Sequence, residues 1–282
     1  MRSRSFSCSA IAMALGLVLT LALACHSTFA FDLNDDSEKS RSPFELFKFG
    51  FSAYKNGHKD EAIKALRYAA ERGHQGAKWK LARMYAEGDG VAEDDYEAYK
   101  IFEKIVREGS EPGSENAPYV ADALVALAGY VKNGIPGSPV QANPNMAREL
   151  YVQAAANFGD SIAQFELGKM LLDGEGGERN AVQAARWFQL AARKGNTGAQ
   201  AMLGNMLFQA GKTVRGLAML TAAFERCPAE DCTWIRDMQE QAFSIAGEAD
   251  RRNAIALASD YAVKAVTENS PMSQSDVSGA SG

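Results

Sequence analysis

The chain is poor in the residues that break helices or carry catalysis. Its 282 residues include only eight prolines, four cysteines and three histidines. So few prolines, together with alanine-rich runs such as 154–156 and 191–192, favour helices over sheets. The formal net charge of −5 lacks the basic excess of a nucleic-acid-binding protein, so the sequence predicts no nucleic-acid partner.

Residues that could form a catalytic or metal site are scarce. Beyond residue 30 only His58 and His74 remain, each directly after a glycine in an expected turn. We expect both to be solvent-exposed; the alternative is a weak pH switch, because histidine titrates near neutral pH. The turns at 88–90 and 174–176 follow helices, not strands, and lack the lysine of a phosphate loop. The sequence predicts no enzyme, no metal and no cofactor.

The first thirty residues have the features of a secretory signal peptide. A basic start is followed by an uncharged apolar run over 10–24 and by the small-x-small sequence Thr28-Phe29-Ala30. We expect cleavage between Ala30 and Phe31, which makes the protein periplasmic or secreted. No later segment is apolar enough to cross a bilayer, so we expect no membrane insertion after cleavage.

The four cysteines divide between this leader and the late part of the chain. Cys25 raises the alternative of lipoprotein processing, although the residues before it, Ala22-Leu23-Ala24, lack the usual aliphatic residue three positions earlier. After cleavage at residue 30 only Cys227 and Cys232 remain. In an oxidising compartment this pair predicts a disulfide. A metal site or a redox-active pair is the alternative.

A repeating pattern organises the middle of the chain. The distance from Gly73 to Gly109 is 109 − 73 = 36 residues, and from Gly159 to Gly195 it is again 195 − 159 = 36. A fixed period of this length with two helical halves predicts an all-α solenoid of helix-turn-helix repeats. The expected organisation is a signal peptide (1–30), an N-terminal arm (31–42), a repeat array (43–226), a disulfide loop with capping helices (227–268) and a disordered tail (269–282).

Within the array we expect a leading hairpin at 43–72 and repeats at about 73–108, 109–158, 159–194 and 195–226. Repeat two is longer by 14 residues, which sit in two Pro/Gly/Ser-rich loops at 110–118 and 134–139. The leading hairpin should begin at the cap Ser42, bury an aromatic stripe of Phe44, Phe47, Phe51 and Tyr54, and start its second helix at Asp60. Small residues should let paired helices approach: Ala77, Ala82, Ala98 and Gly168.

The repeat pattern resembles the Sel1-like repeat, a relative of the tetratricopeptide repeat. The motif is Gly-x-x-x-Ala-x-x-x-Leu-(Gly/Ala)-x-(Met/Leu)-(Tyr/Leu)-x-x-Gly-x-Gly-Val with an alanine-rich partner helix, and it covers about Gly50 to Glu225. The resemblance implies a right-handed superhelix that mediates protein–protein contact. Repeat two and the turn of repeat four depart from the motif.

The whole chain also resembles a family of rhizobial periplasmic regulators of exopolysaccharide production. The signal peptide, the Phe31-Asp32 start, the helix at 44–50 and the late cysteine pair carry this resemblance. It implies a negative regulator that binds the periplasmic domain of a membrane sensor histidine kinase, holds this two-component system off and so represses succinoglycan-type exopolysaccharide. A periplasmic protease is a second implied partner. The alternatives are a scaffold for envelope or polysaccharide assembly and an envelope hydrolase.

Tetratricopeptide-like geometry then predicts a binding face. Leu81, Leu127, Leu167 and Leu203 are taken as equivalent core positions, so residues two places away, and those one turn further along each helix, should face the concave groove. The candidate protein-binding residues are Trp79, Arg83, Glu87, Lys132, Phe165, Lys169, Asp173, Asn205 and Phe208. The alternative for Trp79 and Phe165 is packing between repeats. The acidic loop 110–118 is a second candidate, for a partner or a protease, or else a plain connection.

Overall fold

The computed structural model describes residues 40–227 and 232–267. This part of the chain is all helical and contains no strand. The helices are α2 Pro43–Lys55, α3 Lys59–Glu71, α4 Gln75–Glu87, α5 Asp95–Glu108, α6 Ala117–Asn133, α7 Pro144–Asn157, α8 Ser161–Asp173, α9 Ala181–Arg193, α10 Thr197–Gln209, α11 Thr213–Arg226, α12 Thr233–Ile245 and α13 Glu248–Thr267.

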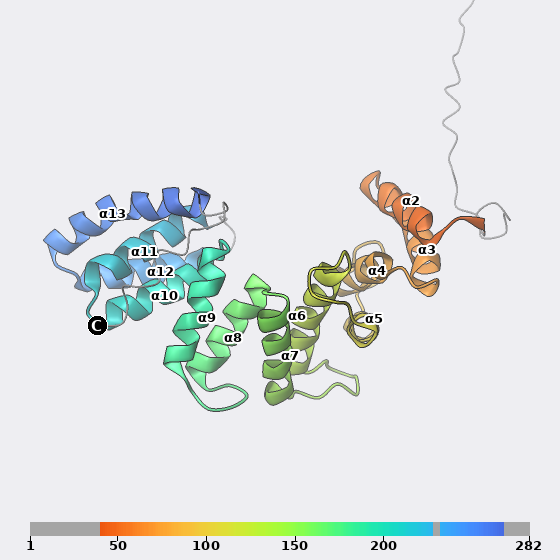
Figure 1. Ribbon diagram of the computed structural model, residues 1–282, viewed down its shortest axis with the longest axis horizontal. Helices are drawn as coiled ribbons and strands as arrows, with labels where there is room; N and C mark the ends of the chain where they lie inside the picture. Colours follow the sequence, from red (N-terminus) through yellow and green to blue (C-terminus); the bar gives the residue numbers. More distant parts are fainter. Residues whose placement is uncertain (1–39, 228–231, 268–282) are drawn as a thin grey trace, which may run out of the picture.

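The helices stack as successive hairpins along a curved array (Figure 1). The pairs α2/α3, α4/α5, α6/α7, α8/α9 and α10/α11 pack within themselves and against the next pair. At the end of the array α12 and α13 both pack on α11. The expected right-handed solenoid with a helical C-terminal cap is confirmed.

Most helix starts carry the cap that the sequence offers. Ser42 and Glu45 form a reciprocal capping box at α2. Asp94 accepts a hydrogen bond from the Glu97 N–H at the start of α5. The expected start at Asp60 is wrong: α3 begins at Lys59, with His58 at the cap position and no side-chain cap.

Glycine is needed where the first helix of a hairpin ends. Gly88 (φ 64°) and Gly174 (φ 79°) end α4 and α8 in the left-handed conformation, which other residues adopt at a cost. This reverses the chain into a seven-residue connection, 88–94 or 174–180, before the partner helix. The Gly-x-Gly turns are therefore structural features of the hairpin.

Small residues face large ones where paired helices cross. A Cβ atom on Gly168 would lie 2.5 Å from the Cε1 atom of Phe188, which is fully buried. The leading hairpin has the same arrangement, since a Cβ on Gly50 would lie 2.8 Å from the Cγ of Leu66. The expected small positions are buried: Ala77, Ala82, Ala98 and Gly168. Close approach through small residues is thus confirmed.

The expected buried aromatic stripe on α2 is found only in part: Phe47, Phe51 and Tyr54 are partly buried, and Phe47 and Tyr54 pack against the core. The face of α2 that meets α3 consists of Leu46, Gly50 and Ala53, all buried, whereas Phe44 is 58% exposed. The reason is the tight crossing at Gly50, which leaves no room for rings between the two helices. The aromatic residues therefore lie beside the contact and not within it.

His74 differs from the expected exposed turn histidine, whereas His58 is exposed as expected. The His74 ring is half-buried and stacks on Phe47 with ring centroids 4.4 Å apart. Its Nδ1 atom accepts a hydrogen bond from the Ala77 N–H, which caps α4. Burial lowers the pKa of His74; nearby Glu115 acts to raise it and Lys78 to lower it.

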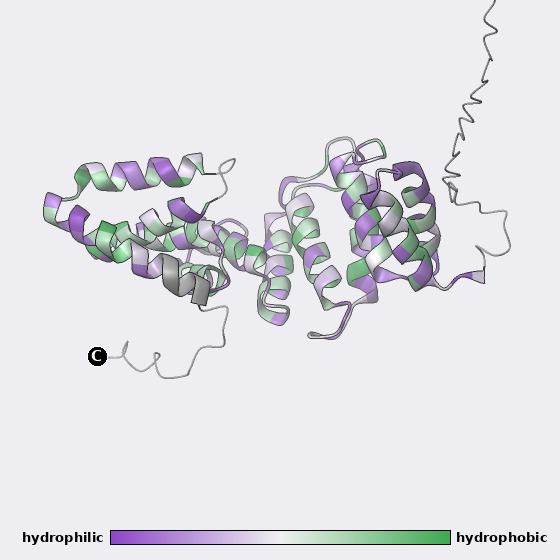
Figure 2. Ribbon diagram, turned by 90° about the horizontal axis from the view of Figure 1, so that it is seen from above, coloured by the Kyte–Doolittle hydropathy of each residue, from purple (hydrophilic) through white to green (hydrophobic). Residues whose placement is uncertain are grey.

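Buried side chains form three hydrophobic clusters along the array. The first joins α2, α3 and α4, the second runs from α4 to α10, and the third joins α10 to α13. Helices α4 and α10 each contribute to two clusters, through Leu81 and Ala82 and through Ala199 and Ala201. Leu203 is only partly buried, so it is not the full core equivalent of Leu81. Figure 2 shows apolar and polar residues mixed along every helix, as amphipathic packing requires.

Candidate protein-binding surface

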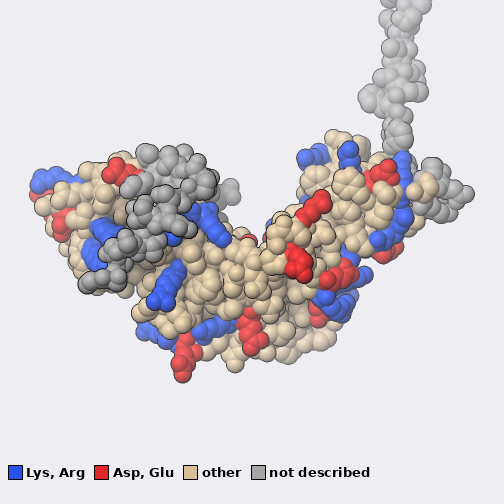
Figure 3. Space-filling view, viewed as in Figure 1, with Lys and Arg blue, Asp and Glu red and all other residues tan. Residues whose placement is uncertain are grey.

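The array is hollowed between its N-terminal and C-terminal parts. Figure 3 shows this hollow at the top of the view, with acidic side chains on the wall that lies over the α4–α6 part of the chain. A curved solenoid gains an extended surface in this way, and such surfaces bind other proteins. The predicted binding residues lie on helices α4, α6, α8 and α10.

On α4, Trp79 is held by the next repeat. Its Nε1–H donates a hydrogen bond of 2.5 Å to Oδ2 of Asp122 on α6, and its ring lies 5.7 Å from that of Tyr119. The Trp79 side chain is partly exposed. Trp79 therefore packs between repeats and also lies at the surface. One turn along, Arg83 is exposed and forms an ion pair with Glu87 on the same helix.

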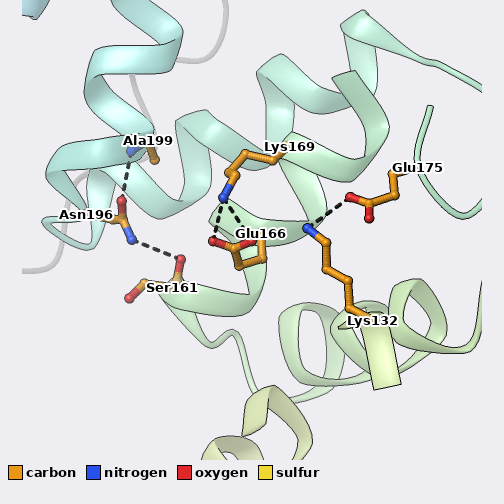
Figure 4. Close-up of polar contacts among 7 residues, drawn as sticks. All are labelled: Lys132, Ser161, Glu166, Lys169, Glu175, Asn196 and Ala199. Atoms are coloured by element: carbon orange, nitrogen blue, oxygen red, sulfur yellow. Dashed lines mark hydrogen bonds and ion pairs between the residues drawn. The ribbon is translucent and has the colours of Figure 1, made fainter. Parts of the chain in front are cut away.

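The predicted lysines of α6 and α8 form ion pairs within the chain (Figure 4). Lys132 lies 2.9 Å from a carboxylate oxygen of Glu175, which ties α6 to the α8–α9 connection. Lys169 donates to Glu166 at 3.0 Å, and its Nζ atom lies 5.2 Å from the centre of the Phe165 ring. Figure 4 also shows Asn196 linking neighbouring elements: its Oδ1 accepts from the Ala199 N–H at 2.8 Å, and its Nδ2 donates to the Ser161 carbonyl at 3.4 Å.

Of the remaining predicted binding residues, some pack against neighbouring helices and some lie at the surface. Phe165 lies 5.9 Å from the Phe188 ring, and a Cβ on Gly198 of α10 would come within 3.0 Å of it, so Phe165 fills the junction between α8, α9 and α10. Asp173 is exposed at the end of α8. Asn205 and Phe208 are partly exposed on α10, and Phe208 packs against the C-terminal cluster.

Two open cavities have lining residues from α4 and α6. The smaller, of about 370 Å³, is lined by Arg83, Asp95, Tyr130 and Asn133 together with apolar residues of α4 to α6. The Tyr130 hydroxyl donates to Oδ1 of Asp95 at 2.8 Å. Burial, and then this bond, raise the pKa of Tyr130 far above its usual value, so the phenol stays protonated.

The larger cavity, of about 800 Å³, is named the Trp79 groove. Four segments line it: the Trp79 side of α4, the start of α6 with its preceding loop, the turn between α7 and α8, and Lys194 directly after α9. Its lining residues are Trp79, Gly113, Ser114, Ala117, Pro118, Tyr119, Ala121, Asp122, Asn157, Phe158, Gly159, Asp160, Ser161 and Lys194. In the structure, Trp79 and the loop 110–118 line the same groove, although the sequence pattern indicates two separate candidate binding sites.

Sequence reasoning missed several residues of the Trp79 groove. Tyr119, Asp122 and Phe158 were not identified as surface residues, because their role depends on how repeats one, two and three stack. One signal was available for Asp122. It is the sole acidic residue between Ala117 and Tyr130, a segment that is otherwise apolar. A lone carboxylate there requires either a partner or an opening to water.

The late cysteines lie within disulfide reach. The Cα atoms of Cys227 and Cys232 are 5.7 Å apart, inside the usual range for a disulfide. Among the residues that the structure describes, no group of three or more histidine, cysteine or acidic residues could hold a metal ion. The helices of this region are all too short or too polar to cross a membrane. The expected cleavage after Ala30, before Phe31, lies outside the described residues, as do most of the N-terminal arm and the C-terminal tail.

Comparison with known proteins places the chain among bacterial regulators. It is 53% identical over 233 residues to the exopolysaccharide production negative regulator of Rhizobium leguminosarum bv. viciae, covering 83% of this chain and 87% of that protein. It is 54% identical over 228 residues to the regulator of the same name from Rhizobium meliloti, covering 81% and 85%. The chain belongs to the family of these exopolysaccharide production negative regulators.

The chain contains Sel1 repeats. The Sel1 repeat matches residues 76–110, 121–157 and 161–196, which correspond to the hairpins α4/α5, α6/α7 and α8/α9. The flanking hairpins α2/α3 and α10/α11 lack the Gly-x-Gly turn and fall outside the match. Two solved structures share the fold: a protective antigen of uropathogenic Escherichia coli with an SLR fold, and a Sel1 repeat protein from Oxalobacter formigenes.

The likeness to these two solved structures shows the fold of the chain and nothing about its role. The Escherichia coli antigen has a TM-score of 0.64 at 24% identity, covering 87% of this chain and 52% of that one. The Oxalobacter formigenes protein has a TM-score of 0.58 at 22% identity, covering 80% and 88%.

Proposed function

We propose that the chain is a negative regulator of exopolysaccharide production that acts by binding another protein and carries out no catalytic step. The relatives with that name are 53% and 54% identical and match along 87% and 85% of their own length. A likeness that covers 83% and 81% of this chain takes in most of the molecule, and so favours a shared role.

We infer that the protein acts in the periplasm. The first thirty residues have the basic start, apolar run and small-x-small site of a cleaved signal peptide. The position of Cys227 and Cys232, with Cα atoms 5.7 Å apart, suits a disulfide, which persists in oxidising compartments such as the periplasm.

The proposed partner is the periplasmic domain of a membrane sensor histidine kinase, which the regulator holds in its inactive state. The observation that supports a protein partner is the Trp79 groove, an open cavity of about 800 Å³ lined by aromatic, acidic and loop residues. Tryptophan and tyrosine are common at the centre of protein interfaces. A periplasmic protease that removes the regulator is a second proposed partner.

Binding of the chain from Phe31 onward to an isolated kinase periplasmic domain tests this directly, by calorimetry or pull-down. Saturable binding, together with raised kinase signalling and exopolysaccharide when the gene is deleted, is the expected result. Absence of binding would contradict the kinase-inhibitor role and leave a scaffold for envelope or polysaccharide assembly as the better account.

Charge reversal on the α4 and α8 surface gives a finer test. The double variant Arg83→Glu and Lys169→Glu places each new carboxylate beside an existing one, Glu87 or Glu166. Both pairs are solvent-accessible, so their loss should cost the fold about 0–1 kcal/mol each. We expect weaker kinase binding with an unchanged helical circular dichroism spectrum.

A matched control exists in two ion pairs of the same spacing elsewhere. Lys100 pairs with Glu97 three residues away on α5, and Arg252 pairs with Glu248 four residues away on α13. The double variant Lys100→Glu and Arg252→Glu should bind the kinase domain normally. Equal binding by both double variants would move the interface to the loops or the convex face.

A further inference from the structure

We propose that the Trp79 groove binds a lysine- or arginine-bearing segment of the partner protein. This inference deepens the proposed function and rests on it for the identity of the partner. It concerns a surface distinct from Arg83 and Lys169, and it specifies the chemistry that the partner must present.

The charges around the groove are predominantly negative. Asp122 and Asp160 line it, and Glu111 and Glu115 lie exposed in the loop that forms one side. The cation among the lining residues is Lys194, which donates a hydrogen bond to the Gly159 carbonyl oxygen. Two carboxylates thus line the groove and two more lie in the adjoining loop, against one lining ammonium group, and a segment of positive charge would complement them.

The contacts of Asp122 leave its charge uncompensated. Its Oδ2 atom accepts a hydrogen bond from the neutral indole N–H of Trp79 at 2.5 Å, which orients the ring but supplies no positive charge. The carboxylate therefore lies beside an aromatic ring that this hydrogen bond orients. An incoming ammonium or guanidinium group could approach both at once.

The aromatic residues of the groove fit the same ligand. Trp79 and Tyr119 have ring centroids 5.7 Å apart and are both partly exposed. A cation over such rings is attracted by the negative charge density of the ring face. The chain uses this contact within itself, since the Nζ atom of Lys80 lies 3.5 Å from the centre of the Tyr54 ring.

The shape and the overall charge exclude other ligand classes. The groove is open and of about 800 Å³, which suits a peptide segment continuous with a larger partner. Nucleic acid, anionic lipid or an acidic polysaccharide would bring negative charge toward four carboxylates on a chain whose formal net charge is −5. A cationic protein segment meets no such repulsion.

The test neutralises the groove without removing its hydrogen-bond acceptor. The triple variant Glu111→Gln, Glu115→Gln and Asp122→Asn keeps an amide oxygen for the Trp79 indole. The control triple Glu103→Gln, Glu225→Gln and Glu240→Gln changes the net charge equally, at three exposed acids outside the groove. Calorimetry measures binding of each chain to the kinase periplasmic domain at low and at physiological salt.

We expect the groove triple to weaken kinase binding roughly tenfold and to reduce its salt dependence, while the control triple binds as the unaltered chain does. Equal weakening by both triples, or no weakening by either, would overturn the cationic-segment inference while leaving the kinase partnership intact.

A defined peptide separates the two proposals if the kinase domain fails to bind. The probe is a nine-residue glycine-serine peptide carrying three lysines and two arginines, compared with the same peptide carrying five glutamates. Saturable binding of the cationic peptide that the groove triple loses supports the inference even though the kinase partnership has failed. No difference between the two peptides would overturn it.

Discussion

Replacing Gly216 by alanine should destabilise the solenoid, although alanine is the better helix former. Gly216 lies in α11, where this helix crosses α10. A Cβ atom at Gly216 would lie 2.6 Å from the backbone nitrogen of Phe208 and 2.7 Å from the carbonyl oxygen of Gly204. These are backbone atoms, so no side-chain rotation can relieve the contact, and the two helices must move apart.

The magnitude follows from two opposing terms. Alanine gains about 1 kcal/mol over glycine in a helix interior. Overpacking a close contact costs about 1–3 kcal/mol, and the upper end applies where backbone meets backbone. We therefore expect the Gly216→Ala variant to lose about 2 kcal/mol of unfolding free energy, equivalent to a fall of about 4–8 °C in Tm for a domain of this size.

Gly129→Ala is the matched control. Gly129 also lies inside a helix, α6, but a Cβ there would meet nothing closer than the Tyr151 hydroxyl at 4.0 Å. The Gly129→Ala variant should gain up to about 1 kcal/mol of unfolding free energy. Urea denaturation followed by circular dichroism compares the two. If Gly216→Ala proves as stable as Gly129→Ala, then α10 and α11 do not cross in backbone contact and the packing described here is wrong.

Two further predictions concern the turn histidine and the cysteine pair. Burial lowers the pKa of His74, so the stability that its neutral form provides is present above about pH 6.5 and is lost as the pH falls below that value. Replacing His74 by asparagine, which caps α10 at Asn196, should flatten the change in unfolding midpoint between pH 7 and pH 5; an unchanged slope would show that other groups dominate. Reduction of a Cys227–Cys232 disulfide should cost about 2 kcal/mol on the loop-entropy account, and a Cys227→Ser and Cys232→Ser double variant should show the same loss with no further response to reductant.

The repeats could be predicted because local sequence signals mark where the helices begin and end. The cap at Ser42, the turns at 88–90 and 174–176 and the 36-residue spacing can be read from the sequence, and each has the structural role expected of it. The face of α2 could not be predicted from spacing alone. Phe44, Phe47 and Phe51 follow a helical period as well as Leu46, Gly50 and Ala53 do, and the tight crossing at Gly50 decides between the two faces.

The candidate site was predictable only in part for a related reason. The position of Trp79 two residues before Leu81 indicated a surface role, and it lines the groove. Its partner Asp122 lies 43 residues away on the next repeat, across an enlarged loop whose path the sequence pattern does not define. The spacing rule also treats Phe165 as equivalent to Trp79, yet its ring lies against Phe188 and α10, because each junction packs with its own side chains.

The division of the core into three hydrophobic clusters affects how the molecule would melt. The first two clusters are linked only through α4 and Ile101 of α5, and the last two through α10, so heating should loosen the two ends before the middle. A partner that spans the hollow would contact residues supported by more than one cluster. Its binding would then sharpen the thermal transition as well as raise its midpoint, because the clusters could no longer open one at a time.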